Sequence, residues 1–206
     1  MYDLAQELPQ WVIGATTIGL VCKDGVILAS EKRVSLGYFV MSKAGKKVFR
    51  ITDRVGAACA GLTSDFQILI RTMVAQANLY ALEMNTGIPV KAVAKLMSNI
   101  LFSRRMLPLI TQTIVAGVDE DGAKLYALDL LGSLIPDQYA AVGSGSRVAI
   151  GVLEASYKPE MTVKEGRALA IKAIKSASER DVASGEGIDV LTITSKGAED
   201  YFESLK

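Results

Sequence analysis

The sequence predicts an α+β protein in which two antiparallel β-sheets pack face to face and pairs of helices cover their outer sides. Segments with the two-residue period of strands come in blocks and do not alternate one by one with helices, which argues against a doubly wound parallel sheet. Segments with the helical period occur twice, each time as a pair. Of the 206 residues, 50% are apolar, which suits one domain with a sizeable core.

The first block of strands is expected to begin with a hairpin over residues 17–30. Two runs of β-forming apolar residues are joined there by Asp24 and Gly25, a dipeptide that favours a tight hairpin turn. Further short strands are expected at residues 38–41, 47–51 and 55–60. Residues 1–14, before the hairpin, are mixed in character and are interpreted as a leader outside the core.

A pair of helices is expected next. Apolar residues recur at spacings of three and four over residues 66–84, which is the pattern of an amphipathic helix. Thr63 or Ser64 is expected to cap its first turn, because hydroxyl side chains accept hydrogen bonds from free backbone N–H groups. The second helix is predicted over residues 90–105 and is expected to end before Pro108.

The second half repeats this order of strands and helices. Strands are expected at residues 111–118, 124–130, 138–142 and 188–194, the first two as a second hairpin and the last as the final strand. A third helix is expected to begin near Arg147. Thr162 and Glu165 form a capping box that opens a fourth helix, which is expected to end near residue 180. Gly185 suits a C-cap after that helix.

The composition excludes several classes of function. There is no histidine, so Ser-His-Asp and Cys-His catalysis are ruled out and a zinc site is not expected. The net charge of +1 offers no basic excess for nucleic acids or membrane surfaces, and no apolar run is long enough for a membrane span. Cys22 and Cys59 are expected to be buried free thiols, which fits a reducing cytosol. Residues 1–14 lack the features of a signal peptide.

Three polar segments have a plain local interpretation. The segment 143–146, Gly-Ser-Gly-Ser, stands between a predicted strand and a predicted helix, where a tight turn with a cap is favoured over an anion-binding loop. One of Lys46 and Lys47 is expected to point inward, since side chains of a strand alternate between faces, and Glu31 is a plausible partner for its charge. Residues 180–185 are interpreted as a polar exit from the fourth helix.

Together with the start of the first hairpin, these segments occur in one order along the chain. They are Gly14-Ala15-Thr16-Thr17-Ile18-Gly19, Glu31-Lys32-Arg33, Gly45-Lys46-Lys47, Ala60-Gly61, Gly143-Ser144-Gly145-Ser146, Arg180-Asp181-Val182-Ala183-Ser184-Gly185 and Ile188-Asp189. No single motif is specific, but the ordered set resembles the archaeal-type β subunit of the 20S proteasome, a threonine peptidase of the N-terminal-nucleophile hydrolase class. The resemblance covers nearly the whole chain from Gly14 onward, and its last segments separate it from the bacterial HslV-type protease.

The resemblance implies a four-layer αββα sandwich, with residues 1–14 as a propeptide-like leader and residues 15–206 as one domain. Family members remove the leader by self-cleavage, at the position that matches the bond between Gly14 and Ala15 in this chain, and assemble with α subunits and other β subunits into a barrel of stacked seven-membered rings. The resemblance further implies unfolded proteins as substrates, a regulatory ATPase cap bound through the α rings and a cytoplasmic location. No cofactor, metal, nucleic acid or membrane is expected to take part.

The resemblance also implies roles for particular residues. Lys47 matches the lysine that tunes the nucleophile electrostatically, and Glu31 matches the acid that holds this lysine, where many members have aspartate. The supporting polar network near the nucleophile matches Ser144, Asp181 and Ser184. Gly61 would offer its N–H to an oxyanion, and Ser35 and Gly61 would pair with a substrate strand. The pocket for the side chain before the cut bond matches Val34, Gly45, Phe49, Cys59 and Thr63, whose mostly apolar nature implies an apolar preference.

The nucleophile position itself is occupied by Ala15, and this is the departure from the family pattern. A methyl group cannot attack a carbonyl or drive self-cleavage. Thr16 is expected to face the opposite side of the strand, and Thr17 to lie about 6.6 Å further along, whereas attack needs an approach of about 3–3.5 Å. The chain is therefore expected to be inactive and unprocessed on its own.

The origin of Ala15 and the role of the chain leave several interpretations open. The chain is either a natural silent paralogue or a variant in which threonine was replaced by alanine, and the intact remainder of the site mildly favours a recent or deliberate loss. In the alternative, it is a purely structural and assembly β subunit that works beside an active β paralogue. A third interpretation, an unrelated sandwich protein that binds a small molecule, predicts a monomer.

Overall fold

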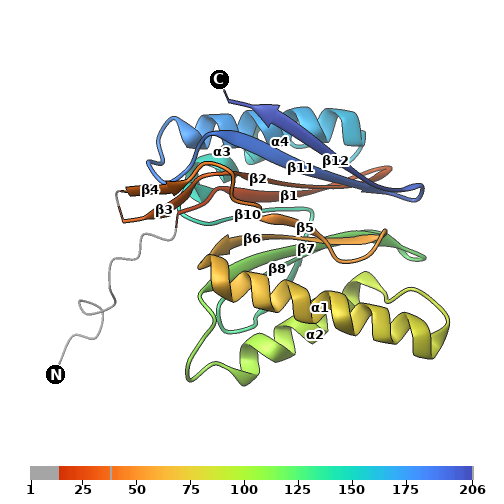
Figure 1. Cartoon of the computed structure of the whole chain (residues 1–206). Coiled ribbons are helices and arrows are strands. Elements are labelled where there is room, and N and C mark those ends of the chain that lie inside the picture. The colour runs from red at the N-terminus through yellow and green to blue at the C-terminus, as the bar shows by residue number, and fades with distance from the viewer. Residues whose placement is uncertain (1–13, 38, 206) are drawn as a thin grey trace.

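The structure is a computed structural model that describes residues 14–37 and 39–205. The chain forms four layers, in which two five-stranded antiparallel sheets face each other and a pair of helices covers the outer side of each sheet (Figure 1). The predicted α+β class and the αββα order of layers are confirmed. Of the predicted leader, only Gly14 lies within the described residues.

The first sheet has the strand order β10-β1-β2-β11-β12. Its strands are β1 (Thr17–Cys22), β2 (Gly25–Glu31), β10 (Tyr139–Val142), β11 (Gly187–Thr194) and β12 (Gly197–Ser204). The predicted hairpin of β1 and β2 is present, with Cys22 opposite Gly25 at the turn. Because β1 pairs with β2 on one side and with β10 on the other, it is an interior strand of this sheet.

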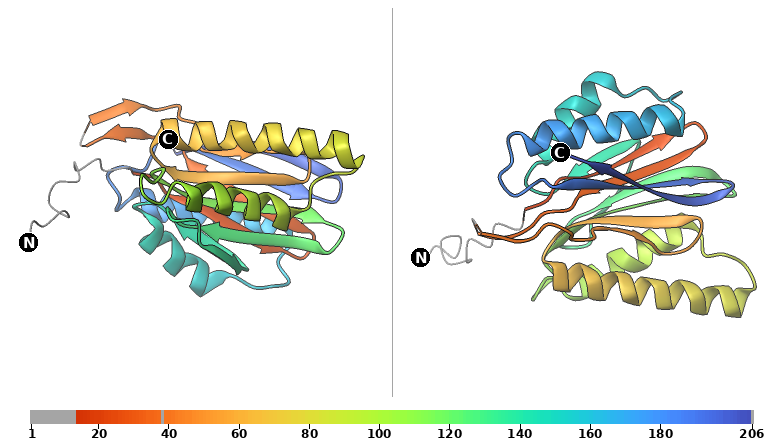
Figure 2. Two further views of the ribbon diagram at one scale, coloured as in Figure 1. Left: turned by 90° about the horizontal axis from the view of Figure 1, so that it is seen from below. Right: turned by 45° about the horizontal axis from the view of Figure 1, so that its top comes forward.

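The second sheet has the strand order β5-β6-β7-β8-β9. Its strands are β5 (Val48–Arg50), β6 (Val55–Gly61), β7 (Thr111–Asp119), β8 (Gly122–Leu128) and β9 (Leu134–Asp137). A separate hairpin of β3 (Val34–Leu36) and β4 (Phe39–Ser42) projects past both sheets at the end where the described chain begins (Figure 2). The hairpin follows Glu31 and precedes Lys47, so it brings these two residues together at its base.

The described residues contain four helices, namely α1 (Thr63–Met84) and α2 (Val90–Ser103), which cover the second sheet, and α3 (Ser146–Ser156) and α4 (Val163–Ser178), which cover the first. The inner face of α1 buries the apolar residues of the predicted helical pattern, among them Phe66, Leu69 and Met73. α4 begins with the predicted capping box, since Thr162 N–H donates to the Glu165 carboxylate at 2.8 Å and Glu165 N–H donates to Thr162 Oγ1 at 3.3 Å. Within the described residues, none of the helices is long and apolar enough to cross a membrane.

Three apolar clusters hold the layers together. The central cluster lies between the two sheets and includes Leu28, Ile114 and Leu191. The other two clusters lie between each sheet and its pair of helices. Cys22 and Cys59 are buried free thiols, as predicted, and burial raises the pKa of each to about 12. Both thiols therefore stay protonated at neutral pH and serve as apolar packing groups.

The start of α1 differs from the prediction. β6 ends at Gly61, whose φ of +141° turns the chain directly toward the helix, and the N-cap position falls on Leu62. Thr63 and Ser64 are therefore already inside the helix, and the N-cap residue makes no side-chain capping bond. A strand that turns into a helix within one residue leaves no room for a separate hydroxyl cap.

Two helix ends and three strands also differ from the predictions. α2 ends at Ser103 and α4 at Ser178, each two residues before the predicted end, and Glu179 rather than Gly185 occupies the C-cap of α4. The strands β3, β9 and β12 were not predicted, and β12 rather than β11 is the last strand. β9 and β12 are largely exposed edge strands, and β9 contains Pro136, so neither has the alternating pattern of a half-buried strand.

Candidate active site

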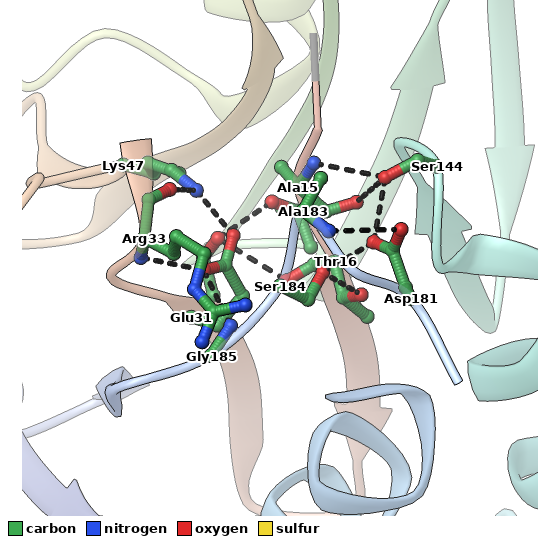
Figure 3. Close-up of polar contacts among 12 residues, drawn as sticks. Ala15, Thr16, Glu31, Arg33, Lys47, Ser144, Asp181, Ala183, Ser184 and Gly185 are labelled. Carbon is green, nitrogen blue, oxygen red and sulfur yellow. Dashed lines mark hydrogen bonds and ion pairs between the residues drawn. The ribbon is translucent and has the colours of Figure 1, made fainter. Parts of the chain in front are cut away.

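Ala15 is fully buried in the segment that leads into β1. Its N–H donates to Ser144 Oγ at 3.2 Å, and its carbonyl oxygen accepts from Gly145 N–H at 3.2 Å. In the view of Figure 3, Ala15 lies between Lys47 on one side and Ser144 on the other. The backbone at position 15 is thus fixed by the loop between β10 and α3.

Lys47 is the buried residue of the lysine pair and Lys46 is exposed, so one of the two points inward as expected. Strand alternation is not the reason, because both lysines precede β5 and the next residue, Val48, is buried as well. The Lys47 ammonium forms an ion pair with Glu31 and donates to Arg33 O at 2.5 Å. The side chains of Lys47 and Glu31 are only 4% and 0% exposed. Burial lowers the pKa of Lys47 and raises the pKa of Glu31, and in each case the attraction between the two groups opposes the shift. Lys47 therefore gives up its proton more readily than a free lysine does.

A second polar group lies on the other side of Ala15. Ser144 Oγ and Ser184 Oγ each donate to Asp181 Oδ2 at 2.6 Å, and Thr16 Oγ1 lies 2.7 Å from Ser184 Oγ (Figure 3). Two of these residues come from the segment between α4 and β11, which we call the network loop (residues 181–186). The other two come from the β10–α3 loop and from the segment just before β1, so these contacts connect three segments that are distant in sequence.

The network loop also reaches the buried ion pair. Gly185 N–H donates to Glu31 Oε2 at 3.1 Å, and Lys32 N–H donates to Gly185 O at 3.2 Å. The predicted catalytic residues that this arrangement gathers around position 15 are Glu31, Lys47, Ser144, Asp181 and Ser184. The fold therefore assembles one polar site from motifs that are spread over most of the sequence.

The hydroxyl groups of the two threonines after Ala15 are engaged elsewhere. Thr16 bonds to Ser184, as described above. Thr17 Oγ1 donates to Cys59 O at 3.1 Å and lies 2.7 Å from Ser30 Oγ. Both threonines are fully buried. These contacts support the expectation that neither hydroxyl acts as a nucleophile.

Gly61 and Ser35, the residues expected to pair with a substrate strand, lie on β6 and β3. With a φ of +141° and the carbonyl oxygen of Ile110 where a Cβ would stand, Gly61 cannot be replaced by a larger residue without strain. Ser35 Oγ is buried and has no hydrogen-bond partner within the described part of the chain.

A cavity of about 310 Å³ opens beside Gly61 and Ser144. Its lining consists of Ala60, Gly61, Ile110, Thr111, Gln112, Leu130, Gly143 and Ser144. Gln112 helps to shape it, since its Oε1 accepts from Gly143 N–H at 3.0 Å. The sequence prediction did not include Ile110, Gln112 or Leu130. Gln112 lies on β7, and Ile110 and Leu130 lie just outside β7 and β8, and no local pattern shows that residues in such places line a cavity.

The residues predicted for the substrate side-chain pocket are Val34, Gly45, Phe49, Cys59 and Thr63, and none of them lines this cavity. Gly45 packs against Val34, and Cys59 N–H donates to Lys47 O at 2.9 Å. Phe49 packs against α1, which Thr63 begins. Their role in substrate selection stays a prediction.

Gly14 packs so closely against the network loop that a side chain is excluded, because an added Cβ would overlap the methyl group of Ala183. We predict that Gly14→Ala lowers the free energy of unfolding by about 1–3 kcal/mol, the usual effect of overpacking a buried position. The matched control is Gly151→Ala in α3, where an added Cβ meets open space and alanine is the better helix former. Chemical denaturation compares the two, and equal effects would contradict the close packing at Gly14.

The fold and the site together define a class of protein. A four-layer αββα sandwich whose first strand begins beside a buried Lys-Glu pair has the architecture of the N-terminal-nucleophile hydrolases. The family model described as "Proteasome subunit" matches residues 12–193, which is most of the chain. The chain belongs to the proteasome subunit family.

Archaeal relatives identify the type of subunit. Proteasome subunit beta 1 of Nitrosopumilus maritimus is 48% identical over 199 residues, which cover 97% of this chain and 100% of that protein. Proteasome subunit beta 2 of Caldivirga maquilingensis is 50% identical over 182 residues, 88% of this chain and 91% of that protein. Proteasome subunit beta 2 of Pyrobaculum neutrophilum is 47% identical over 191 residues, 93% and 94% of the two chains. The resemblance to archaeal β subunits is confirmed, and it implies assembly with α and β subunits in the core particle.

Proposed function

We propose that this chain is a β subunit of the 20S proteasome core particle whose own peptidase site lacks its nucleophile and whose leader, residues 1–14, stays attached. One observation carries the proposal. The methyl group of Ala15 stands where the Lys47–Glu31 pair and the Ser144–Asp181 contact approach from two sides (Figure 3). In the particle the chain would occupy a seven-membered β ring stacked against α rings.

The surrounding groups suit hydrolysis of a peptide bond by a threonine at position 15. Once the leader is removed and the α-amino group of residue 15 is free, the hydroxyl oxygen would add to the substrate carbonyl carbon and pass its proton to this α-amino group or to a water. The Lys47 ammonium would favour the developing negative charge, and Gly61 N–H would donate to the oxyanion. Cleavage of the C–N bond would release the amine with that proton and leave an ester, which water would hydrolyse. With alanine at this position, the first step has no attacking atom.

The remaining functional features follow from this assignment. The substrates would be unfolded proteins, delivered by a regulatory ATPase cap through the α rings. The pocket around Val34 and Cys59 would prefer apolar side chains, because its lining is mostly apolar. The chemistry uses protein groups alone, so it needs no cofactor or metal. A cytoplasmic location agrees with two cysteines that are free and not paired in a disulfide.

The mass of the chain in the native core particle tests the unprocessed state. We predict a mass that includes residues 1–14, because alanine at position 15 cannot carry out self-cleavage. Intact-mass spectrometry of the purified particle gives this value directly. A chain that begins at Ala15 would show that another subunit or protease removes the leader, and this part of the proposal would then be wrong.

A second candidate function is that of a structural and assembly subunit beside an active β paralogue. It is favoured by the bonds from Gly185 N–H to Glu31 and from the Ser144 hydroxyl to Asp181, which join segments distant in sequence and hold the fold together without any catalysis. It predicts a mixed ring, with peptide hydrolysis only when a second β chain with threonine at the matching position is present. A particle that contains this chain as its sole β subunit and still cleaves peptides would overturn both candidates.

A further inference from the structure

Arg33 connects the two polar groups of the candidate site, although the resemblance implies no role for its side chain. Its backbone N–H donates to Glu31 Oε2 at 2.6 Å, and its carbonyl oxygen accepts from the Lys47 ammonium at 2.5 Å. Its side chain crosses to the network loop, where Nη1 donates to Val182 O at 2.7 Å and Nη2 donates to Glu186 Oε1 at 3.0 Å. One residue thus contacts both the buried ion pair and the loop that carries Asp181 and Ser184 (Figure 3).

The network loop is held in an uncommon conformation at the place where Arg33 binds it. Glu186 has a φ of +77°, which a residue other than glycine keeps only where its surroundings fix it. Its carboxylate contacts Arg33 and, at 3.8 Å, the exposed Lys43. Gly185 lies against the guanidinium, so that an added Cβ would be 2.5 Å from Nη2. With side chains only 23% and 16% exposed, Arg33 and Glu186 are shielded more than an ordinary surface ion pair.

We propose that Arg33 is a positioning residue whose guanidinium fixes the network loop against the Lys47–Glu31 pair. It keeps Asp181 and Ser184 in a constant position relative to Lys47 without contacting the substrate. A planar guanidinium donates to two acceptors in fixed directions, and the single ammonium of a lysine does not reproduce both contacts. The effect of Arg33 on catalysis rests on the proposed function. Its role in holding the network loop against the Lys47–Glu31 pair does not.

The link is tested first in the chain as it stands, with Ala15, by hydrogen exchange of peptides that cover the network loop. Arg33→Gln removes two charge-assisted hydrogen bonds and is expected to speed exchange in the network loop about tenfold or more. The exchange rate of Arg33→Lys should lie between those of Arg33→Gln and the parent. Exchange in β6 and β7 should not change. The matched control is Lys43→Gln, which removes the more distant and exposed partner of Glu186 and should have no effect. Exchange of Arg33→Gln at the parental rate would overturn the proposal.

The effect on the reaction is tested in the assembled core particle on an Ala15→Thr background. Arg33→Gln is expected to lower kcat about 10²-fold, the typical result of displacing reacting groups by about 1 Å. The KM for a fluorogenic peptide should stay within about twofold of the parent, because Arg33 binds no substrate. A rise in KM with unchanged kcat would make Arg33 a substrate-binding residue and refute the positioning role. If Ala15→Thr alone cleaves nothing, the proposed function fails, and the exchange result still decides on Arg33.

Discussion

Replacing Ala15 with threonine is expected to restore both removal of residues 1–14 and hydrolysis of peptides in the assembled particle. The Lys47–Glu31 pair and the Ser144–Asp181 contact are already formed, so the new hydroxyl would complete the set of groups that the reaction needs. Loss of a nucleophile commonly reduces kcat by about 10⁶-fold, and a gain of about 10⁴-fold or more over the Ala15 protein is therefore expected. Intact mass and hydrolysis of a fluorogenic peptide measure the two effects.

Ala15→Val is the matched control, because valine has the shape of threonine without the hydroxyl. It is expected to keep its leader and to show no peptide hydrolysis. Position 15 is fully buried, so both variants must fit the same neighbours, and similar thermal unfolding of the two would show that the added volume is tolerated. A threonine variant that assembles but remains unprocessed and inactive would refute the assignment of position 15 as the nucleophile position.

Replacing Lys47 with methionine is expected to destabilise the chain by about 3–5 kcal/mol near pH 8, because the carboxylate of Glu31 would stay buried without its cation. Methionine keeps most of the length of the lysine side chain, so the change reports on charge more than on packing. The control is Lys46→Met at the neighbouring exposed position, where a change within about 0.5 kcal/mol is expected. Chemical denaturation of the full chain measures each value.

The loss in Lys47→Met is expected to depend on pH. Burial raises the pKa of Glu31 and the Lys47 ammonium opposes this rise, so the pKa of Glu31 should rise further in the variant. A carboxyl group with a raised folded-state pKa favours folding fully below its unfolded pKa of about 4.3, and this contribution is lost as the pH rises through the folded-state pKa. The variant should therefore be closest to the parent at about pH 4 and below, and adding Glu31→Gln should recover most of the loss. A loss that is constant with pH and persists in the double variant would exclude the unpaired carboxylate as its cause.

Elements with a strong local signal are the ones that the sequence predicts well. The hairpin at Asp24-Gly25 and the capping box of Thr162 and Glu165 occur where they are expected, because each depends on residues that are close in sequence. The edge strands β9 and β12 are not predictable in this way. They form because β8 and β11 offer an unpaired side, and their own composition carries little strand signal. The one-residue turn from β6 into α1 also depends on tertiary packing and not on a local sequence signal.

In the candidate site, too, only the features with a local sequence signal are predictable. The sequence predicts that one lysine of the pair at 46 and 47 points inward, with Glu31 at the end of the expected hairpin as a plausible partner, and the structure pairs Lys47 with Glu31. The contacts of Arg33 with Val182 and Glu186 do not follow from the sequence pattern, since they join positions that are 149 and 153 residues apart in the chain. The cavity beside Ser144 is also built from several elements. Contacts that cross from one layer or loop to another are fixed by the tertiary structure, which local patterns do not encode.

The interior place of β1 in its sheet has a consequence for any subunit of this design. A cut after Gly14 would create a new chain terminus that is already immobilised, because the carbonyl groups of Ala15 and Thr16 accept hydrogen bonds from Gly145 and Glu31. The α-amino group that the cut frees would therefore already be in the position where it takes part in the reaction, and no further folding would be needed. Active and silent subunits can therefore share one scaffold and differ by a single side chain.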